Sequence, residues 1–406
     1  MPHVNNGVVA QILDAARRLG AAEAEVFISR EVEFSVEVAK GEVETLSQAE
    51  SVGLGVRVLT QDKRTGFAYA AELTEGSERV VNAAWQNALA NDPDPHSGLP
   101  QDACASDDNW TEEDFARVSV ADKISLAREL EAKTLAADTR VSQVERAAYS
   151  DGSFEVTIAN TYGLCRWYRN SYCTCSVAAV AAESGVDSEM GWEFDFARKF
   201  NQLQRDKVAA DCANHATRLL GGKPCATGTM PVVLDNLVTM QFLGIIGPAL
   251  MANHVLKGKS LFVERVGESI AAPCVTLADQ NDFELGINRA PFDGEGVSAS
   301  STVLVQDGTL RGFLQNSYTA HKMGEQTTAN AGRGSFRSQP DVGATNFYLE
   351  PGTLTQAQLL DRAGDGFFVT EILGAHTADP ISGEFSVGAA GLLIKKGRLA
   401  SPVRGV

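Results

Sequence analysis

A long run of alternating apolar and polar residues near the N-terminus constrains the fold of this chain more than any other feature of its sequence. In residues 25–47, EVFISREVEFSVEVAKGEVETLS, most apolar side chains stand two positions apart, which is the period of a half-buried β-strand. Lys40-Gly41 interrupts the run and is predicted to turn a hairpin. SVGLGVRVLT and GFAYAAEL continue the pattern, so we expect an antiparallel sheet.

Helix-like segments flank this strand material. Four of them carry apolar residues at helical spacing and are expected to be helices: residues 7–19, 75–89, 119–136 and 206–220. Between the last two helices, RVSQVERAAYSDGSFEVTIANTYG is predicted to form two strands around a turn at Asp151-Gly152.

The pattern changes twice along the chain, and these changes suggest domain boundaries. NDPDPHSGLPQDACASDDNW is rich in Pro, Asp and Ser and has no period, so we predict an exposed linker or long loop. After Thr229 the chain becomes Gly-rich with many short strand-like segments. The expected fold class is α+β, with these parts: an N-terminal α/β unit (1–92), a linker (93–110), a middle α/β unit (111–225) and a β-rich C-terminal domain (226–406).

Charge and hydropathy exclude some classes of function. Acidic residues outnumber basic ones by 52 to 35, and the formal net charge of −17 repels phosphate backbones, so direct nucleic-acid binding is not expected. No apolar run reaches the roughly 18 residues that a membrane span needs. MPHVNNGVVA lacks the pattern of a signal peptide, so we expect a cytoplasmic protein with no membrane partner.

The seven cysteines are odd in number and scattered, which does not suit a disulfide framework. Cys173 and Cys175 form a C-x-C pair that is able to bind metal. Their spacing also puts both on one face of a strand in the apolar run TCSVAAVAA, and we favour buried structural thiols.

Two carboxylates in PFDGEG, Asp293 and Glu295, admit two interpretations. As a pair they suit acid–base catalysis or calcium binding. The alternating Gly294 and Gly296 suit a tight turn whose carboxylates accept hydrogen bonds from backbone N–H groups, and we favour this turn. AGRGSFR, which contains Arg333, lacks the G-x-x-x-x-G-K-[ST] pattern of a phosphate loop and is predicted to be mobile or to contact a peptide.

Four segments in order resemble the TldD/PmbA family, also called modulators of DNA gyrase. They are SVGLGVRVLTQDKRTGFAYA, IANTYG, PFDGEGVSASSTVLVQDGTLRGFLQNSYTAHKMG followed by TTANAGRG, and FFVTEILGAHTADPISGEFSVGAAGLLIKKGRLASPV. Together they span nearly the whole chain. Family chains usually continue some tens of residues past SPV, so the C-terminal domain is expected to lack the family's last strands.

The family has a TldD kind of subunit, which carries zinc on a His-Glu-x-x-x-His helix, and a PmbA (TldE) kind without that motif. The six histidines of this chain never lie within five residues of one another: His3, His96, His215, His254, His321 and His376. FLGIIGPALMANHVLKGKS resembles the zinc-bearing region and places Leu243, Gly244 and Pro248 at the motif positions, where leucine and a helix-interior proline are incompatible with zinc. The chain therefore resembles the PmbA (TldE) kind, with zinc expected in a partner and no cofactor of its own.

The resemblance implies a non-catalytic subunit that pairs with a TldD-type zinc subunit, in a complex that degrades or processes small unfolded peptides. The alternative is a stand-alone homodimer that binds peptides or proteins without protease activity, and a hydrolase using other residues also stays open. Five residues are expected to contact peptide or partner: His254, Asp293, Glu295, Arg333 and His321. A helix-end position for His254 and a surface position for His321 are the simpler interpretations, which we favour.

Overall fold

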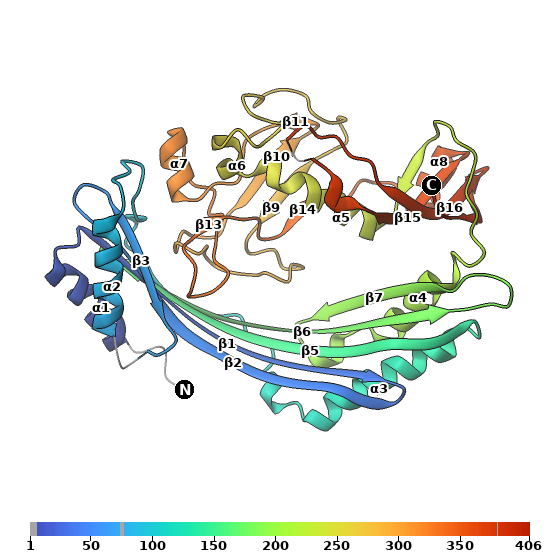
Figure 1. Ribbon diagram of the computed structural model, residues 1–406, viewed down its shortest axis with the longest axis horizontal. Coiled ribbons are helices and arrows are strands. Elements are labelled where there is room, and N and C mark those ends of the chain that lie inside the picture. The colour runs from blue at the N-terminus through green and yellow to red at the C-terminus, as the bar shows by residue number, and fades with distance from the viewer. Residues whose placement is uncertain (1–5, 74–76, 380) are drawn as a thin grey trace.

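The computed structural model describes residues 6–73, 77–379 and 381–406. A curved seven-stranded sheet forms its largest element (Figure 1), with the strand order β3-β2-β1-β5-β6-β4 and with β7 also paired to β6. The strands of this sheet are β1 Glu23–Ala39, β2 Glu42–Leu59, β3 Thr65–Ala70, β4 Ala105–Asn109, β5 Val141–Asn160, β6 Cys165–Ala181 and β7 Glu189–Ala197. Helices and small sheets surround it, which confirms the α+β class.

The hairpin between β1 and β2 forms where the sequence predicts it. Ala39 pairs with Glu42, and the two residues between them have positive φ angles of 54° for Lys40 and 75° for Gly41. Both positive angles are what a two-residue type I′ turn requires, which explains the glycine at the second position.

The predicted turn at Asp151-Gly152 is wrong, because β5 runs straight through it. Asp151 pairs with Phe34 of β1 on one side and with Cys173 of β6 on the other. Its carboxylate lies 2.5 Å from the ammonium of the buried Lys123, so it is held by a helix instead of by a local turn. Tertiary contacts thus override a dipeptide that favours turns in isolation.

The first two units of the chain share the one sheet, because β1 pairs antiparallel with β5 from Glu25↔Asn160 to Val38↔Ala147. The segment 93–110, predicted as an exposed linker or long loop, contains β4 at Ala105–Asn109, which pairs parallel with the start of β6. The five residues of β4 are all polar or small, so their sequence did not indicate a strand.

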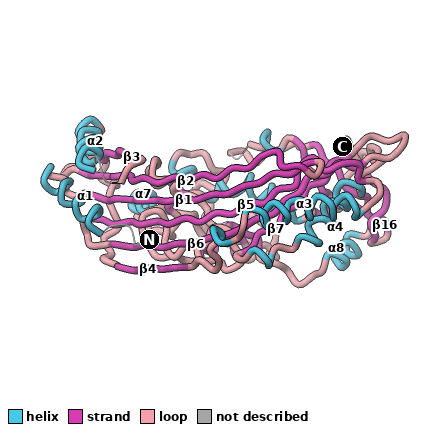
Figure 2. The backbone as a smooth tube through the Cα atoms, turned by 90° about the horizontal axis from the view of Figure 1, so that it is seen from below, coloured by secondary structure: helices cyan, strands magenta, loops and turns pink. Residues whose placement is uncertain are grey.

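Four helices cover one face of the sheet. They are α1 Asn6–Leu19, α2 Ser77–Ala90, α3 Val120–Ala137 and α4 Arg205–Thr217, and residues 75 and 76 of the predicted second helix lie outside the described residues. Even-numbered residues of β1 face these helices: Val26 and Ile28 belong to the core under α1 and α2, and Phe34, Val36 and Val38 to the core under α3 and α4. Seen from below, α1 and α2 lie at one end of the strands and α3 and α4 at the other (Figure 2).

The opposite face of the sheet starts with Glu25 and Phe27 and meets the C-terminal domain. Figure 1 shows this domain above the concave side of the sheet. A separate apolar cluster fills the contact, in which Phe27 and Ile158 of the sheet pack with Phe292 and Phe336 of the domain. The period of two in the sequence therefore supplies one face for the helices and one for this contact.

The C-terminal domain is β-rich, as predicted, but its strands are short. One four-stranded sheet has the order β11-β10-β9-β14, a second has β17-β16-β15-β8, and β12 pairs with β13. The strands are β8 Val232–Leu234, β9 Leu277–Gln280, β10 Ser301–Gln306, β11 Thr309–Leu310, β12 Ala331–Gly332, β13 Asp341–Val342, β14 Phe347–Leu349, β15 Gly366–Leu373, β16 Gly388–Lys395 and β17 Arg398–Val403.

Helices of this domain are also short: α5 Asn236–Ile246, α6 Ala252–Leu256, α7 Ser317–Met323 and α8 Gln356–Ala363. Single 3-10 turns lie at Phe115–Arg117, Phe200–Gln202, Gly247–Leu250 and Ala375–Thr377. Across the three described ranges, no helix has both the length and the apolar character needed to cross a membrane.

Cys173 and Cys175 lie on β6 and point into the core beneath α3 and α4, with 0% and 1% of their surfaces exposed. Neither forms a disulfide. Burial, assisted by the nearby charge of Asp195, raises the pKa of Cys175 to about 12, so this thiol stays protonated at neutral pH. The prediction of buried structural thiols is confirmed.

Candidate functional site

A buried cluster of four charged side chains joins the sheet to the C-terminal domain. Glu25 and Arg57 are directly opposite each other on β1 and β2. Arg57 donates through Nη2 to Oε2 of Glu25 at 2.9 Å and to Oε1 of Glu295 at 3.1 Å. Arg333 also donates to Glu25, and the two carboxylates and the Arg333 side chain are each only 1% exposed. Two acids and two guanidinium groups balance in charge, as a buried ionic cluster requires.

The charge state of Glu25 follows from its neighbours. Burial alone raises the pKa of this carboxyl, but Arg333 and Arg57 outweigh burial and hold the pKa below its ordinary value. Glu25 is therefore ionised at neutral pH, and each of its oxygens accepts a hydrogen bond from a different arginine.

Asp293 caps a tight turn, as the sequence predicts. Its Oδ1 accepts hydrogen bonds from the backbone N–H of Glu295 at 2.9 Å and of Val297 at 3.0 Å, and its Oδ2 accepts from Ala331 at 3.0 Å. Gly296 takes the positive φ of 83° that closes the turn. Burial, with the charge of Glu295 as a second cause, raises the pKa of Asp293 to about 7.

The loop that contains Arg333 and Phe336 is packed against β2, which does not suit the mobile alternative of the prediction, and its contact with a peptide stays a prediction. Phe336 is 1% exposed and its ring lies 6.3 Å from that of Tyr69. Two glycines of β2 make room for it: a Cβ at Gly53 would overlap the Phe336 ring, and one at Gly55 would stand 2.5 Å from its carbonyl oxygen. The alternating glycines of SVGLGVRVLT thus form a notch for the AGRGSFR loop.

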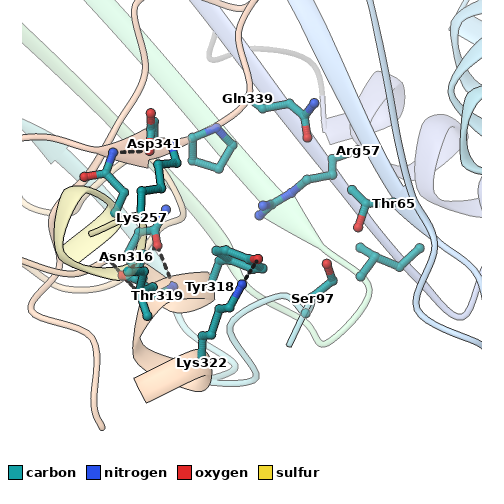
Figure 3. Close-up of a pocket in the computed structure, with 15 residues that line it drawn as sticks. Arg57, Thr65, Ser97, Lys257, Asn316, Tyr318, Thr319, Lys322, Gln339 and Asp341 are labelled. Carbon is teal, nitrogen blue, oxygen red and sulfur yellow. Dashed lines mark hydrogen bonds between the residues drawn. The ribbon is translucent and has the colours of Figure 1, made fainter. Parts of the chain in front are cut away.

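A pocket of about 330 Å³ lies beside the ionic cluster, where β2 and β3 meet α6 and α7 (Figure 3). We call it the α6–α7 pocket. Its polar lining includes Arg57, Asn253, Lys257, Asn316, Tyr318 and Lys322, and its apolar lining includes Leu59, Leu256 and Pro340. Lys322 donates to the Tyr318 hydroxyl at 3.2 Å, and this hydroxyl donates to Asp94 at 2.9 Å.

A second hollow, of about 420 Å³, lies between the sheet and the C-terminal loops. Phe27, Tyr168 and Phe292 line it together with Asp293 and Arg333. Glu295 does not line it and has both carboxylate oxygens engaged, Oε1 by Arg57 and Oε2 by the Ser317 N–H at 2.9 Å. Asp293 and Arg333 line this hollow, but the Arg333 side chain is only 1% exposed and both oxygens of Asp293 accept backbone hydrogen bonds. Contact between Glu295 and a peptide would require the cluster to open.

The two histidines do not join these carboxylates. His254 is half-buried in the last turn of the short helix α6, a helix-end position as predicted. His321 is exposed on α7, and its Nδ1 lies 3.2 Å from the carbonyl oxygen of His96. The surface interpretation of His321 is confirmed, and contact of either histidine with a partner stays a prediction.

The residues at the positions of the family's zinc motif do not fit a zinc ion. Helix α5 ends at Ile246, and Pro248 lies in the following 3-10 turn, Gly247–Leu250, so one regular α-helix does not carry all three positions. Leu243 offers only an apolar side chain and packs in the core of the domain. Within the described ranges, no three His, Cys, Asp or Glu side chains are grouped so as to hold a metal ion.

Sequence reasoning missed Glu25 and Arg57, although both left a signal. Arg57 stands in the middle of LGVRVL, where every other side chain is apolar, and such an isolated charge in a buried strand needs a partner. The identity of that partner depends on the register of β1 and β2 and on a turn more than 200 residues away, which one sequence does not reveal.

Comparison with known proteins agrees with this arrangement. Three family models match the chain in order: PmbA/TldA metallopeptidase domain 1 at residues 24–88, the central domain at 113–220 and the C-terminal domain at 227–406. The metalloprotease PmbA of Escherichia coli O157:H7 is 28% identical over 94% of this chain and 82% of its own length. A metalloprotease TldD homologue of Haemophilus influenzae is also 28% identical, over 87% of this chain and 75% of its own length.

Solved structures share the fold. A putative modulator of a DNA gyrase from Thermotoga maritima has a TM-score of 0.86 and 26% identity, and the match covers 98% of this chain and 90% of that one. TldE from Thermococcus kodakarensis has the same TM-score and coverage at 19% identity, which shows the fold alone. With three consecutive domains matched and the whole fold shared, the chain belongs to the PmbA/TldD metallopeptidase family.

Proposed function

We propose that this chain is a non-catalytic subunit that pairs with a TldD-type zinc subunit in the cytoplasm. The complex degrades or processes small unfolded peptides. The partner supplies the zinc ion and the glutamate that activates its bound water, and this chain supplies binding surface.

The observation that carries the proposal is the state of the motif region. A His-Glu-x-x-x-His zinc site needs its two imidazoles, five residues apart, on one face of a helix. Here Leu243 and Pro248 stand at the equivalent positions, and helix α5 ends at Ile246, before it reaches Pro248. Equal identity to a PmbA and a TldD relative does not separate the two kinds of subunit, so the proposal relies on the side chains at these positions.

The surface around α5 supports pairing. All of α5 is described, and only Val238 of its eleven residues is buried, although the helix is rich in Leu, Ile, Met and Phe. Met240 on α5 is 53% exposed, and Phe385, 56% exposed, has its ring 5.4 Å from that of Phe242. Leu373, 64% exposed, ends β15, a strand that contacts α5. We call Met240, Phe242, Leu373 and Phe385 the α5 patch. Exposed apolar side chains on neighbouring elements are typical of protein interfaces.

Sedimentation velocity at micromolar concentration tests the pairing. We expect the chain alone to form a homodimer and to exchange into a heterodimer when a TldD-type subunit is added. A stable interface of this kind buries at least about 1,200 Å² in total. Replacing Met240 and Leu373 together by Asp is expected to weaken both dimers at least about 100-fold, because two charges would lose water in the interface.

The matched control is Leu135→Asp on α3, which covers the face of the sheet away from the C-terminal domain (Figure 1). Leu135 is 39% exposed, so this change adds one charge at a comparable surface leucine, and we expect pairing to persist. A wild-type chain that stays monomeric and ignores the TldD-type subunit would overturn the proposed function. If the double variant dimerises as strongly as the wild type, the interface lies outside the α5 patch.

A further inference from the structure

The α6–α7 pocket has a positive lining in a strongly acidic chain. The net charge is −17, yet Arg57, Lys257 and Lys322 line this one pocket. The charge of Arg57 is balanced by its ion pairs with Glu25 and Glu295. In the described part of the chain, Lys257 has no ion-pair partner, and Lys322 donates only to the Tyr318 hydroxyl. Two ammonium groups are therefore free to meet an anion.

The only carboxylate in the lining is engaged through one of its oxygens. Asp341 accepts hydrogen bonds through Oδ1 from Nδ2 of Asn253 at 2.9 Å and from the backbone N–H of Val342 at 2.8 Å. Asp94 does not line the pocket, and its carboxylate accepts a hydrogen bond from the Tyr318 hydroxyl. Neither acid forms an ion pair with Lys257 or Lys322 among the described residues.

Asn316 adds a neutral donor that is built into the pocket. It is 4% exposed and caps α7, where its Oδ1 accepts from the Thr319 N–H at 2.9 Å and from the Thr319 hydroxyl at 3.0 Å. These two bonds fix the orientation of the amide, so Nδ2 is the atom left over. Nδ2 has no partner within the described residues, and Asn316 lines the pocket near Tyr318 and Lys322 (Figure 3).

The pocket also has an apolar side, formed by Leu59, Leu256 and Pro340. Its volume of about 330 Å³ is at the low end of ligand pockets, so it suits one residue better than a whole peptide. A group with one anionic end and one apolar end matches this lining.

We infer that the α6–α7 pocket binds the C-terminal residue of a peptide, with the terminal carboxylate held by Lys257, Lys322 and Nδ2 of Asn316 and an apolar side chain against Leu59, Leu256 and Pro340. The choice of a peptide rests on the proposed function, whereas the preference for a carboxylate rests on the pocket itself. Ammonium groups form charge-assisted hydrogen bonds with carboxylates, which are stronger than neutral ones.

Fluorescence anisotropy with a labelled Ala-Ala-Leu tripeptide tests this assignment. The free acid is expected to bind at least about tenfold more tightly than the C-terminal amide, because the amide forfeits the charge-assisted bonds. Replacing Lys257 and Lys322 together by Met is expected to remove that difference. Asn316→Asp keeps an acceptor for the α7 cap but places a negative charge at the ligand, so it is expected to favour the amide.

Lys259→Met is the matched control, since Lys259 is exposed two residues from Lys257 but does not line the pocket. It removes the same charge and is expected to leave both affinities unchanged. Equal binding of acid and amide by the wild type would overturn the inference, and so would equal losses in Lys259→Met and the double variant. Displacement of the tripeptide by inorganic phosphate at equal concentration would assign the pocket to free anions and also overturn it. Pairing with a TldD-type subunit is measured separately by sedimentation, so failure of the pocket leaves the proposed function standing.

Discussion

Glu295→Met is expected to lower the free energy of unfolding by about 3–5 kcal/mol, the cost of breaking a buried ion pair from one side. The Glu295 carboxylate is 1% exposed and accepts hydrogen bonds from Arg57 and from the Ser317 N–H. Methionine is similar in length, so the change removes the charge with little loss of volume. Arg57 and Arg333 would then share the single carboxylate of Glu25.

Urea denaturation followed by circular dichroism measures this loss. Glu284→Met is the matched control: Glu284 is exposed, forms no ion pair among the described residues and lies in the same domain. Surface changes of this kind usually alter stability by about 0.5 kcal/mol or less. Similar losses in both variants would show that the buried cluster contributes nothing particular.

A double-mutant cycle separates the ionic contact from the packing around it. Arg57→Met is expected to destabilise as well, because Glu25 and Glu295 would then face each other with only Arg333 between them. Combining Arg57→Met with Glu295→Met leaves Glu25 and Arg333 as a balanced pair. The double variant is therefore expected to lose at least about 1 kcal/mol less than the sum of the single losses. Strict additivity would contradict a direct coupling between Arg57 and Glu295.

Features governed by local sequence could be predicted, and features governed by register could not. The Lys40-Gly41 turn needs two residues with positive φ, and the buried Cys173 and Cys175 follow from the strand period alone. Asp151-Gly152 has an equally strong local turn signal. It remains extended because β5 pairs there with β1 and β6 and because Lys123 of α3 binds the Asp151 carboxylate.

The candidate site could be predicted in part, for the same reason. Asp293 caps its own turn, so neighbouring glycines were sufficient to predict its contacts. Glu295 belongs to a cluster whose other members are Glu25, Arg57 and Arg333, spread over 308 positions of the chain. These four side chains meet only because the C-terminal domain packs against the sheet, and no local sequence pattern encodes that packing. The α6–α7 pocket was missed because its lining comes from five separate segments.

The purified chain alone is expected to leave unfolded casein intact, and an equimolar mixture with a TldD-type zinc subunit is expected to cleave it. The rate should rise at least about 100-fold above that of this chain alone, because zinc-bound water is a far stronger nucleophile at neutral pH than free water. Gel electrophoresis over time measures the cleavage. Metal analysis of each protein after gentle purification is expected to find stoichiometric zinc only in the partner, since Leu243 and Pro248 offer no ligand in this chain.

The matched control is a TldD-type subunit whose motif glutamate is replaced by glutamine. It is expected to pair with this chain and to bind zinc but to leave casein intact, because no base removes the proton from the bound water. A chelator is expected to stop cleavage by the active mixture in the same way. Cleavage by this chain alone that resists the chelator would contradict the non-catalytic assignment and favour a hydrolase with its own nucleophile. One tightly bound zinc ion per chain would also contradict the non-catalytic assignment, because it would require a ligand set that the residues around α5 do not provide.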